Sequence, residues 1–182
     1  MSAARRAGTV RISAGRWKGR RLDVPPGARP TSGRAREALF DILAGRVPGA
    51  RVLELYAGSG AVGIEAVSRG AAAAVLVERD AGVLRGNLER LGAGPEISVV
   101  ESGAGEGMRL LASRGARFDI VFSDPPYALE GEPLTVVTHL LAPGALLILQ
   151  RDRNASTSPI EGLARVGDRA YGRNAFEFFE RR

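Results

Sequence analysis

From Arg51 onward, short apolar runs typical of buried strands alternate with segments whose apolar residues recur at helical spacing. The runs predict strands over 52–56, 73–78, 97–100, 118–123 and 145–150. The segments between them predict helices over 61–68, 81–91, 106–113 and 133–141. Strands that alternate with helices at short spacing form right-handed βαβ units. The sequence therefore predicts an α/β fold with a doubly wound parallel sheet.

Further segments flank this alternating region on both sides. Residues 9–13 and 20–24 predict an N-terminal β-hairpin, and 163–171 with 175–180 predict an antiparallel hairpin at one edge of the sheet. The proline-rich stretch 25–30 predicts an extended linker, and a helix over 33–44 follows it, with Thr31 and Ser32 as candidate N-caps. We therefore expect an N-terminal hairpin and linker over 1–30 and a main domain over 31–182.

Several functional classes are excluded by what the sequence lacks. The 182 residues include no cysteine, which excludes disulfides, thiolate metal sites and cysteine nucleophiles. No apolar stretch reaches membrane-spanning length, and the N-terminus lacks the apolar core of a signal peptide. We therefore expect a cytoplasmic protein that has neither a membrane partner nor a metal.

Positive charge is concentrated at the N-terminus. Residues 1–36 carry ten basic side chains and one acid, whereas the rest of the chain has a balance of −3. An arginine-rich genomic composition explains the preference for arginine over lysine but not this asymmetry, so we favour a polyanion-binding face. The candidate nucleic-acid-binding residues are Arg11, Arg16, Trp17, Lys18, Arg20, Arg21, Arg29, Arg34 and Arg36.

For three of these candidates a second interpretation stays open. Trp17 lies in the predicted hairpin loop, where it either stacks on a base or anchors the hairpin in a core. Arg34 and Arg36 lie near the first turn of the predicted helix, where cations oppose the helix dipole. They either meet a ligand anion or are simply solvated.

A glycine-rich loop, Gly58-Ser59-Gly60-Ala61-Val62-Gly63, follows the strand 52–56 and opens a helix. Glu78 lies 20 residues beyond Gly58, at the end of the next predicted strand. This spacing matches Rossmann-like dinucleotide-binding folds, in which glycines permit close approach and the acid binds ribose hydroxyls. A nicotinamide-dependent dehydrogenase is therefore one interpretation.

Glu54 favours a different cofactor, because it lies within a strand that is usually apolar in nucleotide-binding proteins. A buried acid needs a partner, and S-adenosylmethionine carries two cationic groups and no phosphates. The segment 52–60 resembles the first motif of class I methyltransferases, with Tyr56 at a position that is often glycine. The candidate cofactor-binding residues are Glu54, Tyr56, Gly58, Ser59, Gly60, Glu78, Arg79 and Ala104.

The apolar strand 118–123 ends in Asp124-Pro125-Pro126-Tyr127, at the sheet edge where open α/β folds bind ligands. The Asp124 carboxylate and the Pro125 carbonyl can accept both N–H groups of an exocyclic amine, which stabilises charge that develops during in-line attack on a methyl group. Tyr127 can stack on the extruded base. The candidate catalytic residues are therefore Asp124, Pro125, Pro126 and Tyr127, and the alternative is an ordinary strand-terminating turn.

The absence of cysteine narrows the chemistry further. Methylation at carbon 5 of cytosine proceeds through a cysteine adduct, so an amino group is the remaining kind of target on a base. An amino-directed DNA methyltransferase acting on adenine N6 or cytosine N4 is an alternative, although the chain is short for a separate target-recognition domain. A non-catalytic RNA-binding assembly factor that kept the fold is the third interpretation.

Four blocks in order, over residues 11–22, 29–40, 55–66 and 124–127, together resemble the RsmD family of bacterial small-subunit ribosomal RNA guanine-N2 methyltransferases. The resemblance extends to Tyr171-Gly172 before the final strand. It implies a seven-stranded sheet, a hairpin that helps to hold RNA, S-adenosylmethionine as cofactor and a guanine of 16S ribosomal RNA as target in an assembling small subunit. Where this family tends to place Asp or Asn before an alanine to meet the adenine, this chain has Gly103-Ala104, so backbone contacts, Ser102 or Glu101 would serve.

Overall fold

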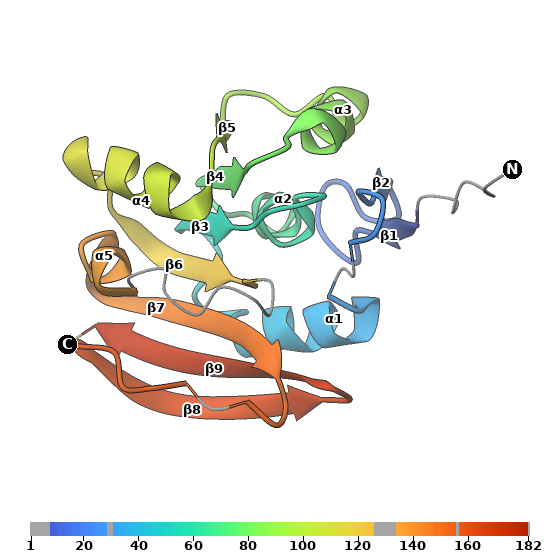
Figure 1. Cartoon of the computed structure of the whole chain (residues 1–182). Helices are drawn as coiled ribbons and strands as arrows, with labels where there is room; N and C mark the ends of the chain where they lie inside the picture. Colours follow the sequence, from blue (N-terminus) through green and yellow to red (C-terminus); the bar gives the residue numbers. More distant parts are fainter. Residues whose placement is uncertain (1–7, 29–30, 126–133, 156, 182) are drawn as a thin grey trace, which may run out of the picture.

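The alternating region forms one seven-stranded sheet, which Figure 1 shows in the computed structural model of the chain. The structure describes residues 8–28, 31–125, 134–155 and 157–181. The strands are β3 (Arg51–Leu55), β4 (Ala73–Glu78), β5 (Ile97–Glu101), β6 (Phe118–Ser123), β7 (Leu141–Asp152), β8 (Leu163–Tyr171) and β9 (Asn174–Arg181). They are arranged in the order β5-β4-β3-β6-β7-β9-β8. Neighbouring strands from β5 to β7 are parallel, and β9 is antiparallel to both of its neighbours, so the predicted C-terminal hairpin is confirmed.

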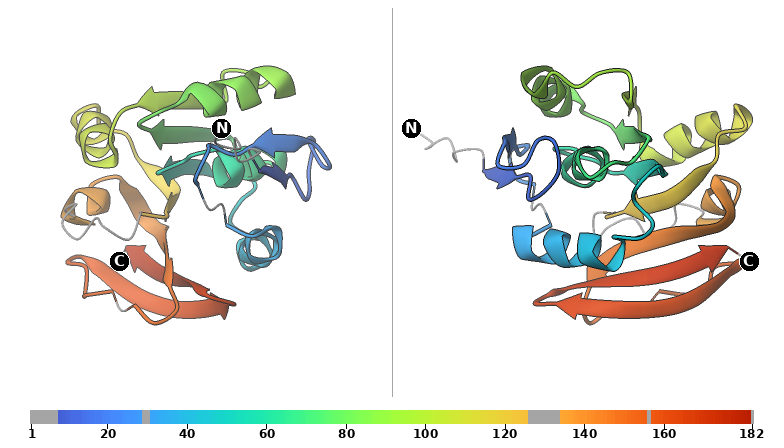
Figure 2. Two further views of the ribbon diagram at one scale, coloured as in Figure 1. Left: turned by 45° about the vertical axis from the view of Figure 1, so that its right-hand side comes forward. Right: turned by 180° about the vertical axis from the view of Figure 1, so that it is seen from behind.

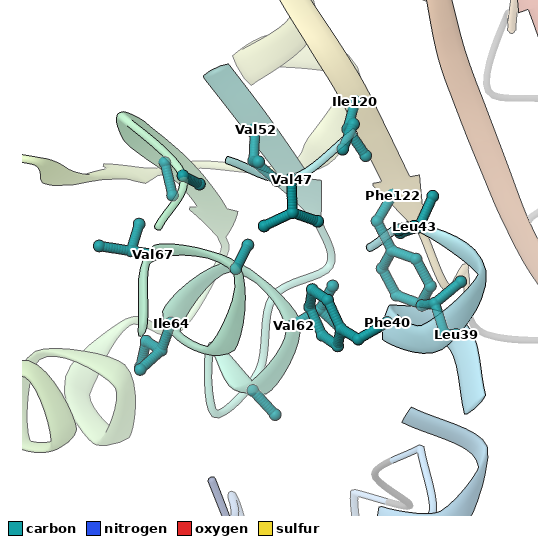
Figure 3. Close-up of a cluster of buried hydrophobic side chains, with 14 of the residues drawn as sticks. Leu39, Phe40, Leu43, Val47, Val52, Val62, Ile64, Val67, Ile120 and Phe122 are labelled. Atoms are coloured by element: carbon teal, nitrogen blue, oxygen red, sulfur yellow. The ribbon is translucent and has the colours of Figure 1, made fainter. Parts of the chain in front are cut away.

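Helices cover both faces of the sheet, as a doubly wound fold requires (Figure 2). The helices are α1 (Gly33–Ile42), α2 (Ala61–Ser68), α3 (Gly82–Leu91), α4 (Ala104–Ser113) and α5 (Leu134–Thr138). Residues of α1, α2 and α3 share one apolar cluster with one side of the sheet, part of which is shown in Figure 3. Residues of α4 and of the segment around α5 share a second cluster with the other side.

One predicted boundary is wrong for a physical reason. The apolar spacing predicted a helix over 133–141, but α5 ends at Thr138 and β7 begins at Leu141. The Leu140 carbonyl accepts a hydrogen bond from the Phe118 amide at 2.8 Å, and Leu140 and Leu141 are fully buried. These two leucines therefore pack and hydrogen-bond with the sheet rather than with a helix. As a result β7 is longer than the predicted strand 145–150.

The predicted N-terminal hairpin is present but short, with strands β1 (Thr9–Arg11) and β2 (Arg21–Asp23). Its loop docks on the end of α2, because the Arg16 amide donates to the Ser68 carbonyl at 2.9 Å and the Trp17 amide donates to the Ser68 hydroxyl at 3.0 Å. A Cβ atom on Gly15 would lie only 1.7 Å from that carbonyl oxygen, so a glycine is needed for this approach.

The hairpin also contacts α3 and contributes to the main core. The Asn87 side chain accepts from the Asp23 amide and donates to the Asp23 carbonyl, each at 2.9 Å. Ile12, Trp17 and Leu22 are buried in the cluster that contains α1 and α2. The division of the chain at residue 30 stays a prediction, and the hairpin is packed on the sheet domain through a shared core.

The strand order places a topological switch point between β3 and β6. From β3 the chain moves to β4 and β5 on one side, and then returns to place β6 on the other side of β3. Ligands of open α/β sheets bind at this switch point, outside the carboxyl ends of the strands.

Among the described residues, no helix is both long and apolar enough to cross a membrane.

Candidate functional site

Strand register brings several predicted site residues to one edge of the sheet. Leu55 on β3 pairs with Val77 on β4 and with Ser123 on β6. The residues that follow, Tyr56 and Asp124, therefore leave the sheet side by side. Glu78 ends β4 at the same edge. The predicted Pro126, Tyr127 and Arg29 lie outside the described residues.

The turn after β3 has an unusual backbone. Tyr56 has a φ of 57° and, among the described residues, is the one non-glycine residue with positive φ. This left-handed conformation costs a non-glycine residue about 1–2 kcal/mol, and such strain is concentrated at functional sites. Gly58, Ser59 and Gly60 complete the turn, and Gly60 is the N-cap of α2. A Cβ on Gly58 would meet no atom within 4 Å, so the outer side of the turn has room for a ligand.

Glu54, predicted to meet a cationic cofactor, has hydrogen-bond partners within the protein itself. The residue is 4% exposed, and its carboxylate accepts hydrogen bonds from the Gly63 amide at 2.7 Å and the Val62 amide at 3.3 Å. These amides lie in the first turn of α2, where a helix favours negative charge. Burial nevertheless raises the pKa of Glu54 to about 8, against the smaller lowering by these two amides. Glu54 therefore links β3 to the first turn of α2 and supports the glycine turn from the interior of the protein.

Glu78 is half-buried and already orders the same turn. One carboxylate oxygen accepts from the Gly58 amide at 2.7 Å, and the other accepts from the Asp80 amide at 3.1 Å. A carboxylate has about four lone-pair sites, so both oxygens can still accept from ligand hydroxyls. The geometry is compatible with the predicted ribose contact.

Asp124 is half-buried at the end of β6 and has a polar neighbour that sequence reasoning missed. The Gln150 side chain on β7 donates to Asp124 Oδ2 at 3.0 Å. Burial raises the pKa of Asp124 to about 7. A carboxylate that is poorly hydrated and close to its titration range is typical of a functional site.

The loop after β5 explains how glycine is accommodated at position 103. Gly103 is the N-cap of α4, and a Cβ there would lie 3.4 Å from an Arg79 guanidinium nitrogen. Arg79 is exposed and lies over this loop, while Ala104 is buried as the first residue of α4. The Ser102 amide donates to the Glu78 carbonyl at 3.0 Å, which holds this loop beside the end of β4.

Two nucleic-acid candidates prove to be core residues. Arg36 is 1% exposed, and its Nε donates to Glu65 Oε2 at 2.7 Å, so the prediction that it meets RNA is wrong. Trp17 is 7% exposed in the main core, with the Arg16 guanidinium 3.8 Å from its ring centroid. Trp17 is therefore the core anchor rather than a free stacking surface.

The other described candidates are exposed. Arg16 pairs with Glu96, and Arg20 donates to the Arg90 carbonyl. Within the part of the chain that the structure describes, the side chains of four exposed candidates form neither an ion pair nor a hydrogen bond: Arg11, Lys18, Arg21 and Arg34. These four can offer cationic groups to a polyanion.

Some of the missed residues carried a usable signal in the sequence. Arg36 precedes Leu39, Phe40 and Leu43 at helical spacing, which places it on the buried face of α1. Glu65 is the single acid in the otherwise apolar α2, which marks it as the partner of a buried cation. Gln150 ends the predicted strand 145–150 at the ligand edge. No group of at least three acidic or histidine side chains suitable for a metal occurs among the described residues.

Comparison with known proteins assigns the family. A family model described as conserved hypothetical protein 95 matches residues 10–180. Ribosomal RNA small subunit methyltransferase D of Escherichia coli K12 is 48% identical over 126 residues, which cover 66% of this chain and 62% of that protein's length. The Haemophilus influenzae protein of the same name is 34% identical over 156 residues, covering 81% of each chain.

The structural comparison agrees with this assignment. The solved structure of yhhF from Escherichia coli, a candidate methyltransferase, has a TM-score of 0.82 and 37% sequence identity. The match covers 96% of this chain and 98% of that one. The methyltransferase fold predicted from the motifs is thereby confirmed. This chain belongs to the RsmD family, together with the proteins named ribosomal RNA small subunit methyltransferase D.

Proposed function

We propose that this chain is an S-adenosylmethionine-dependent methyltransferase that methylates the exocyclic N2 amine of a guanine in 16S ribosomal RNA during small-subunit assembly. The observation that carries the proposal is the half-buried Asp124 carboxylate, held beside the strained Tyr56 turn at the switch point of the sheet. The names of the relatives support an rRNA substrate. The choice of the guanine N2 amine comes from the family resemblance.

The residues at the edge of the sheet fit this cofactor. Glu78 would accept hydrogen bonds from the ribose hydroxyls, and the open side of Gly58 leaves room for a ligand. Arg79 and the backbone around Ala104 would border the adenine. When bound, S-adenosylmethionine supplies an electrophilic methyl group on a sulfonium.

The chain's own contribution to the chemistry is made by the Asp124 loop. An exocyclic amine on a base is a weak nucleophile because its lone pair is delocalised into the ring. The Asp124 carboxylate and the Pro125 carbonyl would accept its two N–H groups and so favour the pyramidal, nucleophilic form. This function requires the ionised carboxylate, because a protonated one loses an acceptor site.

An RNA substrate is consistent with the distribution of exposed cations. Arg11, Lys18 and Arg21 of the hairpin region and Arg34 of α1 are exposed. The hairpin and α1 lie toward the end of the molecule at which the β6 arrow points (Figures 1 and 2). RNA that reaches the Asp124 loop would therefore be close to these cations.

The decisive experiment measures methylated nucleosides in ribosomal RNA by mass spectrometry. A bacterial strain that lacks its own family member is complemented with the wild-type chain or with the variant Asp124→Ala. We expect N2-methylguanosine to return with the wild-type chain and not with the variant. Asp124→Asn is the matched control for shape, since it keeps the size of the side chain and removes the negative charge.

Other outcomes would identify a different activity. If tritiated methyl groups from S-adenosylmethionine enter duplex DNA rather than RNA, the target is a DNA amine. If calorimetry detects no binding of S-adenosylmethionine to the wild-type chain, the protein is a non-catalytic RNA-binding factor. Either result contradicts the proposal.

A further inference from the structure

Asp124 is held in place by a neutral side chain rather than by a cation. Its Oδ2 atom accepts a hydrogen bond from Gln150 Nε2 at 3.0 Å. Among the described residues, Asp124 forms no ion pair. Gln150 is 6% exposed, so water can reach it little and its hydrogen bonds persist. The amide donor therefore has two effects on the carboxylate: it fixes its orientation and favours its charged form.

The orientation of the Gln150 amide is itself determined by Thr31. The Thr31 hydroxyl donates to Gln150 Oε1 at 2.6 Å, and Thr31 is 7% exposed. A glutamine amide can present either its oxygen or its nitrogen to a neighbour. Because the hydroxyl proton is directed at the amide oxygen, the NH₂ group faces Asp124. Without this donor the amide could turn over and present its oxygen to the carboxylate, which would repel it.

Thr31 is in turn anchored by the buried ion pair of α1 and α2. Arg36 Nη1 donates to the Thr31 carbonyl at 3.5 Å, while Nη2 donates to the Arg11 carbonyl in β1. Its Nε donates to Glu65 at 2.7 Å, and Glu65 also accepts from the Ser13 hydroxyl. A buried polar network therefore runs from the N-terminal hairpin through Thr31 and Gln150 to Asp124.

We propose that Gln150 is a positioning residue that aims the Asp124 carboxylate at the substrate amine, and that the Thr31 hydroxyl selects the end of the Gln150 amide that meets it. The N-terminal segment thereby completes the active site as well as contacting RNA. This inference rests on the proposed function of Asp124 for its catalytic part. Its structural part can be measured without any substrate.

The substrate-free test is the titration of the Asp124 carboxyl carbon by NMR. Gln150→Leu removes the donor at similar size, and Thr31→Val removes the hydroxyl at equal size. In both variants we expect the Asp124 midpoint to rise by about one pH unit, because a charge-assisted hydrogen bond is lost. Thr31→Ser keeps the hydroxyl and should restore the wild-type midpoint.

Neighbouring charges must be separated from this effect. Glu54 on β3 interacts electrostatically with Asp124, and Arg36 on α1 interacts electrostatically with Glu54. Because interacting groups titrate as a pair, the series is repeated in a Glu54→Gln background, in which Asp124 titrates without that partner. Thermal unfolding of each variant establishes that it is folded at the temperature of the titration.

The catalytic test measures methyl transfer to small subunits isolated from a strain that lacks the family member. We expect Gln150→Leu and Thr31→Val to lower kcat about 10- to 100-fold with little change in KM for the RNA, and to move the pH profile upward. Thr31→Ser should recover both. If folded Gln150→Leu and Thr31→Val keep the wild-type Asp124 midpoint and the wild-type kcat, the positioning role is overturned. If the wild-type chain transfers no methyl group while the midpoints shift as expected, only the proposed function fails.

Discussion

At the residue scale, Glu54 and Asp124 are two acids held in environments that disfavour their charges. Burial raises the pKa of Glu54 to about 8 and that of Asp124 to about 7. The folded state therefore binds these two protons more tightly than the unfolded chain does, and the contribution of these two groups to stability is highest at low pH. The stability contributed by each protonated group is lost as the pH rises through its folded pKa. A site that needs an ionised Asp124 thus works where the stability contributed by its protonated form has been lost.

The dependence of stability on the protonation of a buried acid can be measured at Glu54, because this residue is not one of the groups proposed to contact the substrate amine. We expect Glu54→Gln to lie close to the wild type in stability near pH 4 and to be more stable near pH 8.5, because the amide, like the protonated acid, carries no charge. The difference should be on the order of a few kcal/mol. Denaturant unfolding across this pH range measures it, with the exposed Glu106→Gln as control. Parallel stability curves for the wild type and Glu54→Gln would contradict this account of the buried acid.

At the scale of elements, the hairpin depends on one close approach. The Gly15 Cα lies against the Ser68 carbonyl at the end of α2, and the hairpin loop hydrogen-bonds to the same residue. Asn87 fixes the other side of the hairpin to α3. The docking is therefore specified by backbone contacts at both ends rather than by apolar burial alone.

Two glycines in the hairpin loop allow a matched test. Gly15 and Gly19 have nearly equal φ angles, 81° and 84°, but a Cβ on Gly19 would meet nothing within 4 Å. Gly19→Ala should therefore show only the conformational cost, about 1 kcal/mol, whereas Gly15→Ala should also undock the loop. Fluorescence of Trp17, the single tryptophan, reports this directly. A red-shifted emission is expected for Gly15→Ala, and equal spectra and stabilities for the two variants would disprove the steric role.

The same elements show what sequence could and could not predict. Periodicity located all seven strands of the main sheet, because burial of one face or both leaves a regular pattern. It misplaced the end of α5, because Leu140 and Leu141 fit a helix stripe and a buried strand equally well. It also missed the bond between Gln150 and Asp124, because side-chain pairing across neighbouring strands depends on register, which the pattern of a single strand does not contain.

At the scale of the whole molecule, the charge asymmetry of the sequence becomes a spatial one. Several hairpin cations are exposed and without ion pairs in the described part of the chain, including Lys18 and Arg21. Helix α4 lies on the other face of the sheet, where Arg109 and Arg114 are exposed as well. The two faces therefore offer cations of similar exposure in different positions relative to the Asp124 loop.

This arrangement predicts which cations govern RNA affinity. Lys18→Gln combined with Arg21→Gln should weaken binding to a 16S ribosomal RNA fragment and reduce the salt dependence of binding by about 1 per lost phosphate contact. Arg109→Gln combined with Arg114→Gln makes the same change in net charge and should leave the slope unchanged. Binding measured from 50 to 200 mM salt compares them. If the two pairs of substitutions change the salt dependence of RNA binding equally, the hairpin cations contribute only through the net charge of the protein.

The position of β9 between β7 and β8 has a consequence for biosynthesis. All the described groups assigned to the site, from Glu54 to Gln150, precede β9 in the chain, yet the strand that carries Gln150 has β9 as one of its two neighbours. A nascent chain that has exposed residues up to 152 therefore has every one of these groups but an unpaired β7 edge. Only when residues 174–181 are available can Phe176 pair with Gln150 and cover the β7 edge. The final arrangement of the site therefore depends on a strand that contributes none of its described groups.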